Sequence, residues 1–202
     1  HYVSASIDGS RDAVFFASTQ YDAYIPAMAT LTYHETVPGH HLQIALEQEL
    51  NQKFLFRTLF FFTGYVEGWA LYAEKLAYEN KWHKDMYSEI EYLFSELFRA
   101  VRLVVDTGIH SKEWTRERAF SYMESSIGWG SYNEIDRYIV WPGQACSYKM
   151  GELKLVELRK KAMDKLGKKF SIKDFHSYVL NNGSLPLEIL EGRIDAYIKT
   201  AK

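Results

Sequence analysis

Few residues in this chain can interrupt a helix, and that scarcity most limits how it can fold. Only 4 prolines and 12 glycines occur among 202 residues, so long segments carry no helix breaker. Between Met86 and Gly108, apolar residues recur at spacings of three and four, as on one stripe of an amphipathic helix. The residues of this stripe are Ile90, Leu93, Phe94, Leu97, Val101 and Val104. We therefore predict a mainly α-helical fold.

Similar periodicity and end signals predict helices through most of the chain. They run from near Pro26 through His34, Leu42 to Asn51, about Phe60 to Asn80, Ser111 to Ser126 with Thr115 as a cap, Ile135 to Val140, Gln144 to Gly167, Ser171 to Leu180, and Pro186 to Lys199. The start differs, because Tyr2 to Ile7 and Ala13 to Thr19 are β-branched and aromatic runs around a Gly-containing loop. We expect a small N-terminal β-hairpin and one mostly helical domain over residues 1–202.

Charge and composition exclude several classes of protein. The chain has 24 Lys plus Arg and 26 Asp plus Glu, a net charge of −2, which argues against a nucleic-acid binder. Apolar runs such as Leu59 to Phe62 are far shorter than the ~20 residues of a transmembrane helix. The single Cys146 can form neither an internal disulfide nor a thiolate metal site. Any metal must be held by histidines and carboxylates.

The first candidate site lies between Tyr33 and Gln43, where His34 and Glu35 precede two further histidines. In a helical His-Glu-x-x-His motif, two imidazoles about one turn apart bind one zinc while the Glu handles a water. Here Pro38 takes the place of the second imidazole, so the strict motif is absent. These residues are either ordinary histidines at a helix break or metal ligands, and the Glu beside His34 favours catalysis.

The Pro38-Gly39 pair changes where the later histidines can lie. On an unbroken helix, His40 would lie about 240° around the axis from His34, and His41 about 10 Å along it, so neither could share a metal with His34. Proline disfavours helical geometry in the residue before it, and glycine adopts dihedral angles that other residues avoid. We predict that the interruption lets a ring after Gly39 swing back towards His34.

Two carboxylates in a later segment are candidates to complete such a site. Glu67 and Glu74 are seven residues apart, so they share one face of the predicted helix. One could be a metal ligand while the other orients a histidine. The alternative is a solvated helical face, but apolar neighbours such as Val66, Trp69 and Ala73 argue for burial.

Two further segments carry weaker signals. Between Asp136 and Gly151, phenols, an amide and a guanidinium gather around a chain break, the groups needed to hold an oxyanion and a peptide backbone. Asp106 and His110 are one turn apart near a predicted helix end. They either bond to each other there or belong to a site.

Taken together, these motifs resemble the bacterial family named domain of unknown function 885, in which several members are described as lipoproteins. The matching pieces are His34-Glu35-x-x-Pro38-Gly39-His40-His41-Leu42-Gln43, Glu67 to Glu74, Arg102 to His110, Pro142 to Ala145 with Ser147-Tyr148, Phe175-His176, and Gly183 to Leu187. Members are longer than this chain, which implies a C-terminal catalytic portion and an upstream helical part as its partner. The resemblance implies a location in the bacterial cell envelope or the cytoplasm.

That family is in turn similar to the helical gluzincin peptidases, which implies a zincin-like catalytic domain and a Zn²⁺-dependent hydrolase of peptides or oligopeptides. By this likeness the zinc ligands are His34, His40 and Glu67, with His41 as second choice and Glu74 as the carboxylate that orients a histidine. Glu35 is implied as the general base. Tyr148 would steady the tetrahedral intermediate, with Tyr138, Arg137 or His110 as further candidates.

Two other functions fit a helical chain with a metal. A carboxylate-bridged dimetal bundle uses paired Glu-x-x-His motifs, and none occurs in this sequence. A non-catalytic helical binding protein could retain a metal for its structure alone. Elemental analysis combined with a peptide-cleavage assay separates the three.

Overall fold

The computed structural model describes residues 1–18, 25–50, 57 and 60–201, and it is mainly helical, as predicted. The helices are α1 (Ile25–Glu35), α2 (His40–Glu49), α4 (Thr63–Glu79), α5 (Met86–Lys112), α6 (Arg116–Ile127), α7 (Tyr132–Val140), α8 (Gln144–Leu166), the 3-10 turn η1 (Gly167–Lys169), α9 (Ile172–Leu180) and α10 (Leu187–Thr200).

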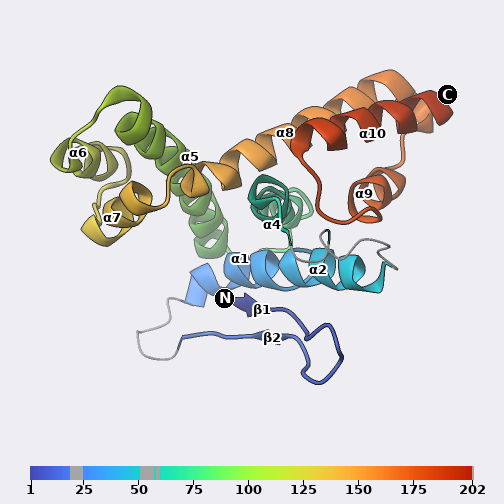
Figure 1. Ribbon diagram of the computed structural model, residues 1–202, viewed down its shortest axis with the longest axis horizontal. Coiled ribbons are helices and arrows are strands. Elements are labelled where there is room, and N and C mark those ends of the chain that lie inside the picture. Colours follow the sequence, from blue (N-terminus) through green and yellow to red (C-terminus); the bar gives the residue numbers. More distant parts are fainter. Residues whose placement is uncertain (19–24, 51–56, 58–59, 202) are drawn as a thin grey trace.

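The predicted N-terminal hairpin is confirmed but is short. Strands β1 (Tyr2–Val3) and β2 (Val14–Phe15) pair antiparallel, with Tyr2 opposite Phe15. The hairpin lies beneath α1 and α2 in Figure 1. The predicted strand end at Thr19 and helix end at Asn51 fall outside the described residues.

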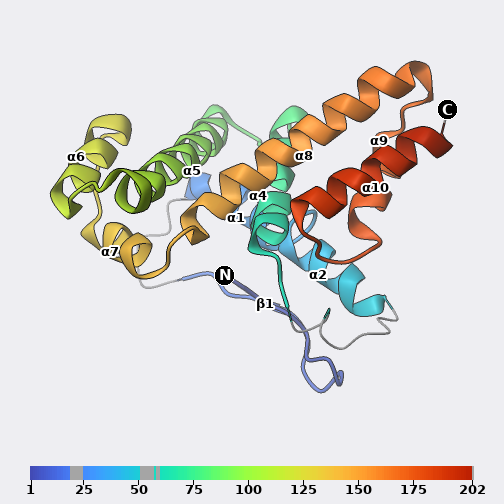
Figure 2. The same cartoon turned by 45° about the horizontal axis from the view of Figure 1, so that its top comes forward.

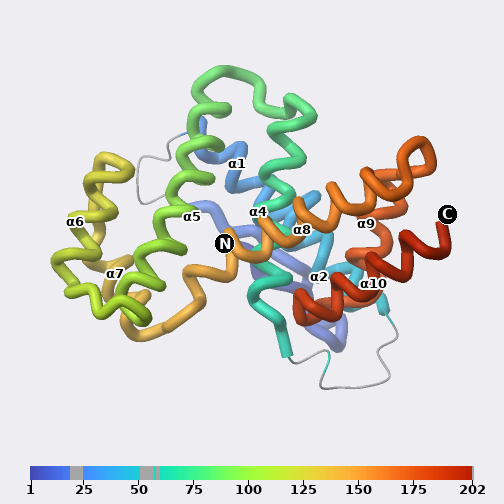
Figure 3. The backbone as a smooth tube through the Cα atoms, turned by 90° about the horizontal axis from the view of Figure 1, so that it is seen from above, coloured from blue at the N-terminus to red at the C-terminus, as the bar shows by residue number. Residues whose placement is uncertain are grey.

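Helix α4 occupies the centre of the molecule (Figure 1). It passes between α1 and α2 on one side and α8 on the other, and it packs against all three. Helices α5, α6 and α7 lie at one end of the molecule and α9 and α10 at the other, as the turned view in Figure 2 and the view from above in Figure 3 both show. Side chains of α4 therefore face elements that are distant in sequence.

The crossing of α4 and α8 is built on two glycines. An added Cβ at Gly68 would lie 2.5 Å from the Cα of Gly151, and one at Gly151 would lie 1.9 Å from the carbonyl oxygen of Gly64. No other residue permits so close an approach of two backbones. The crossing fixes the position of Glu67, the residue before Gly68.

Two apolar clusters hold the ends of the molecule together. The larger packs α4, α8, α9 and α10 around Tyr65, Trp69, Leu158, Phe175 and Ile194. The smaller packs α5, α6 and α7 around Val105, Met123 and Ile135. The candidate site lies where α1, α2 and α4 meet.

The apolar stripe predicted on α5 does not form its buried face. Ile90, Leu93, Leu97 and Val104 are each 38–51% exposed, whereas Val101 is buried. The face of α5 that turns inward carries polar side chains.

No helix among the described residues is long and apolar enough to cross a bilayer.

Candidate metal centre

The connection between α1 and α2 doubles back on itself. Helix α1 ends at Glu35 and α2 begins at His40. An added Cβ at Gly39 would lie 1.8 Å from the backbone oxygen of His34, so only glycine lets the chain return so closely. The indole Nε1 of Trp69 on α4 donates a 2.8 Å hydrogen bond to the carbonyl of Pro38 and holds the connection in place.

This turn brings His34 and His40 face to edge. Their ring centroids are 4.7 Å apart at an interplanar angle of 87°. His41, the second choice for a ligand, is not in this group. Its Nδ1 instead lies 3.2 Å from the hydroxyl of Tyr2 in β1.

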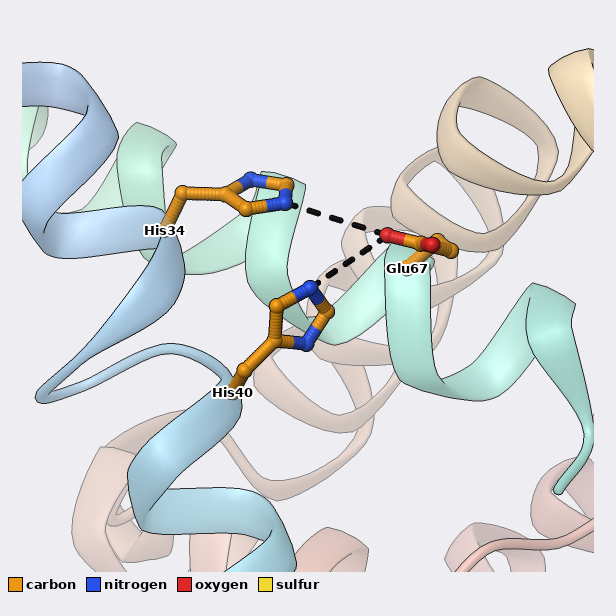
Figure 4. Close-up of side chains that lie close together, drawn as sticks. All are labelled: His34, His40 and Glu67. Carbon is orange, nitrogen blue, oxygen red and sulfur yellow. Dashed lines mark ion pairs between the residues drawn. The ribbon is translucent and has the colours of Figure 1, made fainter. Parts of the chain in front are cut away.

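Glu67 on α4 completes a group of three (Figure 4). Its Oε2 lies 3.8 Å from Nε2 of His34 and 3.4 Å from Nε2 of His40. One ligand atom from each residue lies within 4.8 Å of the others. The three side chains are only 6%, 12% and 17% exposed, in the order His34, His40 and Glu67.

These residues fit a zinc ion. Ligand atoms bound at 2.0–2.1 Å in tetrahedral geometry lie about 3.4 Å apart, close to the spacing seen here. Glu67 Oε2 is buried and has no hydrogen-bond partner among the described residues. A buried carboxylate oxygen without a hydrogen bond is costly, and a cation between the three side chains would offset that cost. Two imidazoles and a carboxylate are also a common ligand set of catalytic zinc.

Glu74 orients the first of these histidines, as its spacing from Glu67 suggested. Its Oε1 lies 2.6 Å from Nδ1 of His34, and its Oε2 accepts a 3.2 Å hydrogen bond from the hydroxyl of Ser95 on α5. A proton on Nδ1 leaves Nε2 of His34 free to face Glu67 and His40. Carboxylates behind metal-binding histidines act in this way.

The charges of the group are strongly coupled. Burial lowers the pKa of His34, but the carboxylates of Glu67 and Glu74 outweigh it and raise that pKa to about 9. Burial likewise raises the pKa of Glu67, and the two imidazoles beside it overcome this effect and hold the pKa well below its usual range. Without a metal, the site therefore favours a protonated His34 beside an ionised Glu67.

Glu35 lies beside His34 in sequence but has a different partner. Its Oε2 accepts a 2.9 Å hydrogen bond from the backbone amide of Tyr2, so its carboxylate is attached to β1. The side chain is 14% exposed. No hydrogen bond or ion pair joins Glu35 to the other candidate ligands in the part of the chain that the structure describes.

Tyr148 on α8 lies next to the group. Its ring stacks beside that of His34, with centroids 6.3 Å apart and an interplanar angle of 21°. Its hydroxyl accepts a 3.2 Å hydrogen bond from Nε2 of Gln144. The Oε1 of Gln144 in turn accepts from Arg137 at 2.9 Å and from Arg102 at 3.4 Å.

The other two predicted site residues lie further along this network. The hydroxyl of Tyr138 donates to Glu134 at 2.8 Å. His110 donates to the backbone carbonyl of Tyr138 at 2.9 Å, about two helical turns along α5 from Arg102. Asp106 accepts from the amide of Gly143 rather than bonding to His110, so of the two alternatives for this segment the Asp-His pair is wrong.

One feature of α5 escaped the sequence interpretation. Its inward face is a polar stripe at spacings of three and four. Each residue of the stripe meets another element: Ser95 meets Glu74, Arg99 meets Tyr148, Arg102 meets Gln144, and Asp106 meets Gly143. The same periodicity that singled out the apolar residues would have revealed it.

Residues 1–194 match the profile of the family described as "Bacterial protein of unknown function (DUF885)". A solved structure described as a putative lipoprotein from Colwellia psychrerythraea superposes with a TM-score of 0.92 and 41% identity, covering 98% of this chain and 35% of that one. No curated protein matches the sequence.

A second solved structure, a putative lipoprotein of unknown function from Shewanella oneidensis, has a TM-score of 0.74 and 27% identity. It covers 82% of this chain and 31% of that one, so this chain spans about a third of either relative. The family profile extends over nearly all of the sequence, and the chain belongs to the DUF885 family of bacterial proteins.

Proposed function

We propose that this chain is the metal-binding part of a zinc-dependent peptide hydrolase. The observation that carries the proposal is the convergence of His34, His40 and Glu67, with Glu74 behind His34. Zinc held there supplies a Lewis acid that activates water and polarises a carbonyl. We also propose that the substrate is a peptide or oligopeptide and that the longer protein has this activity.

Glu35 is the proposed general base. Its position next to His34 and its partly exposed carboxylate suit a group that takes a proton from the attacking water and passes it to the leaving amine. The hydrogen bond from Tyr2 occupies Oε2, and Oε1 lies 3.9 Å from the N-terminal amine of His1. Tyr148 is the proposed donor to the developing oxyanion, because its ring lies beside His34.

The test combines metal content with peptide cleavage. Zinc-loaded wild-type protein should cleave a quenched peptide library. Glu35→Gln should keep one zinc and lose hydrolysis, and Glu67→Gln should lose the zinc as well. Glu117→Gln, an exposed carboxylate on α6, serves as the matched control and should change neither. Cleavage by zinc-loaded Glu35→Gln would show that another group is the base.

A non-catalytic protein with a structural metal is the second candidate. The attachment of Glu35 to the backbone of β1 favours it, because a carboxylate engaged in holding a strand is less free to move a proton. Zinc binding without turnover on any peptide would support it. A dimetal bundle instead requires two ions, which elemental analysis and anomalous scattering at the metal edge would reveal.

A further inference from the structure

We infer that Arg99 on α5 binds the terminal carboxylate of the peptide substrate, so that the enzyme acts at the C-terminal end of peptides. This inference rests on the proposed function. It begins from a pocket of about 310 Å³ between α1 and α5. Its lining includes His34 of α1, Glu74 of α4, and Glu91, Phe94, Phe98 and Arg99 of α5.

Arg99 presents unpaired donors to this pocket. No hydrogen bond or ion pair joins its side chain to any residue that the structure describes, and its Nε is buried without a partner. The guanidinium lies over the rings of Tyr148 at 4.9 Å and Phe98 at 5.4 Å. Aromatic faces hold a guanidinium in place but leave its N–H groups free. A buried donor without an acceptor indicates that a ligand supplies one.

Arg99 and Arg102 place two guanidiniums beside the ring of Tyr148. Arg102, one turn further along α5, is 2% exposed and lies over the same Tyr148 ring at 4.5 Å. Its ion-pair partner is Glu134 at 3.9 Å, which also pairs with Arg137 at 3.5 Å. Arg102 and Arg137 thus share the carboxylate of Glu134, whereas Arg99 has no ion-pair partner among the described residues. Its charge faces a pocket that Glu74 and Glu91 also line, and neither carboxylate forms an ion pair with it.

The shape of the pocket favours a carboxylate attached to an apolar residue. A guanidinium binds a planar carboxylate through two parallel hydrogen bonds, which gives both strength and orientation. Leu31, Phe94 and Phe98 supply apolar walls next to Arg99. A terminal residue seated there would place the preceding peptide bond towards His34, whose ring borders both the pocket and the proposed metal site.

Peptide binding to a variant that cannot hydrolyse peptides tests the role of Arg99 independently of turnover. In zinc-loaded Glu35→Gln protein, calorimetry should show tighter binding of an N-acetylated tripeptide ending in free leucine than of the same tripeptide amide. The preference should be about tenfold to a hundredfold, the contribution of hydrogen bonds between charged groups. The double variant Glu35→Gln, Arg99→Gln should bind the acid and the amide equally. With Arg99→Lys in place of Arg99→Gln, only part of the preference for the acid should remain, because the bidentate geometry is lost.

Arg118→Gln is the matched control, since this exposed guanidinium on α6 also lies over an aromatic ring, that of Trp114, at 4.7 Å. It should leave the preference unchanged. Equal binding of acid and amide, or a preference that survives Arg99→Gln in folded protein, would overturn the inference. Wild-type cleavage of both peptides at equal rates would overturn it while leaving the proposed hydrolase intact. A preference for the acid that depends on Arg99, without any cleavage, would support the carboxylate site and contradict the hydrolase.

Discussion

At the scale of single residues, Glu74 governs how His34 can act. It is 1% exposed and holds Nδ1 of His34 at 2.6 Å. We expect Glu74→Gln to weaken zinc binding by about tenfold to a hundredfold, because the amide is a poorer partner for the ring. Competition with a chelator measures the change. Glu79→Gln, on the same helix but paired with Arg159, should bind zinc like the wild type.

Gly39 is a second residue on which the site depends. An added Cβ at this position would collide with the backbone oxygen of His34, and this close contact requires glycine. Gly39→Ala should displace His40 and lower both zinc affinity and the melting temperature. Gly192→Ala on α10, where an added Cβ meets nothing within 4 Å, should leave stability unchanged or raise it by about 0.5–1 kcal/mol. Equal behaviour of the two variants would contradict this role for Gly39.

At the scale of elements, the mostly buried cation of Lys149 joins α8 to α5. Lys149 on α8 lies 2.6 Å from Glu96 on α5 and 2.8 Å from Glu152 on its own helix. Glu152 is 2% exposed, and burial together with Glu152 raises the pKa of Glu96. Lysine here compensates two carboxylates that would otherwise repel each other in the interior.

Removal of that cation should be costly. We expect Lys149→Met to lower the free energy of unfolding by about 3 kcal/mol, since two buried carboxylates lose their partner. The loss should shrink as the pH falls and Glu96 becomes protonated. Denaturant titrations at several pH values measure it. The double variant Lys149→Met, Glu152→Gln should recover part of the lost stability. If Lys149→Met loses as much stability at low pH as at neutral pH, this account is contradicted.

At the scale of the whole molecule, His176 links elements from distant parts of the chain. It lies on α9, its Nε2 is 2.9 Å from the hydroxyl of Tyr72 on α4, and its ring meets Trp69 edge-on. Burial, together with the positive charge of Arg159, lowers the pKa of His176 from its ordinary value of 6.5 to about 4. The folded protein therefore holds this ring neutral where the unfolded chain would protonate it.

The difference between the two pKa values decides how the stability of the protein changes with pH. Between pH 6.5 and 4 the unfolded chain binds more protons at this position, so its contribution to stability is complete above pH 6.5 and falls as the pH drops towards 4. His176→Gln, which can still bond to Tyr72, should show a smaller loss of stability across this window. Parallel pH dependences of the unfolding free energy in the two proteins would contradict the assignment.

Much of the helical architecture was predictable, because helices are specified by local chemistry. The predicted cap at Thr115 forms, with its side chain accepting from the amide of Arg118, and Ser171 caps α9 by accepting from Asp174. The predicted helix from Gln144 to Gly167 differs from α8 by one residue. Periodicity and capping act within a few residues, so they can be read along the chain.

Periodicity shows both an apolar and a polar stripe on α5, but it does not show which of them turns inward. Its apolar stripe is the stronger pattern, yet its polar stripe faces α4 and α8. Which face turns inward depends on the elements packed against it, and these come from other parts of the chain.

Local sequence was enough to specify most of the helices, the caps at Thr115 and Ser171, and the break at Pro38-Gly39 that frees His40 from the helix of His34. The assembly of the site depended on the tertiary structure. Contact of Gly68 with Gly151 places α4 so that Glu67 reaches both imidazoles, while Arg99 is left facing a pocket without a partner. Helix formation depends on neighbours in sequence, whereas the register of crossing helices depends on shapes that meet only when the chain is folded.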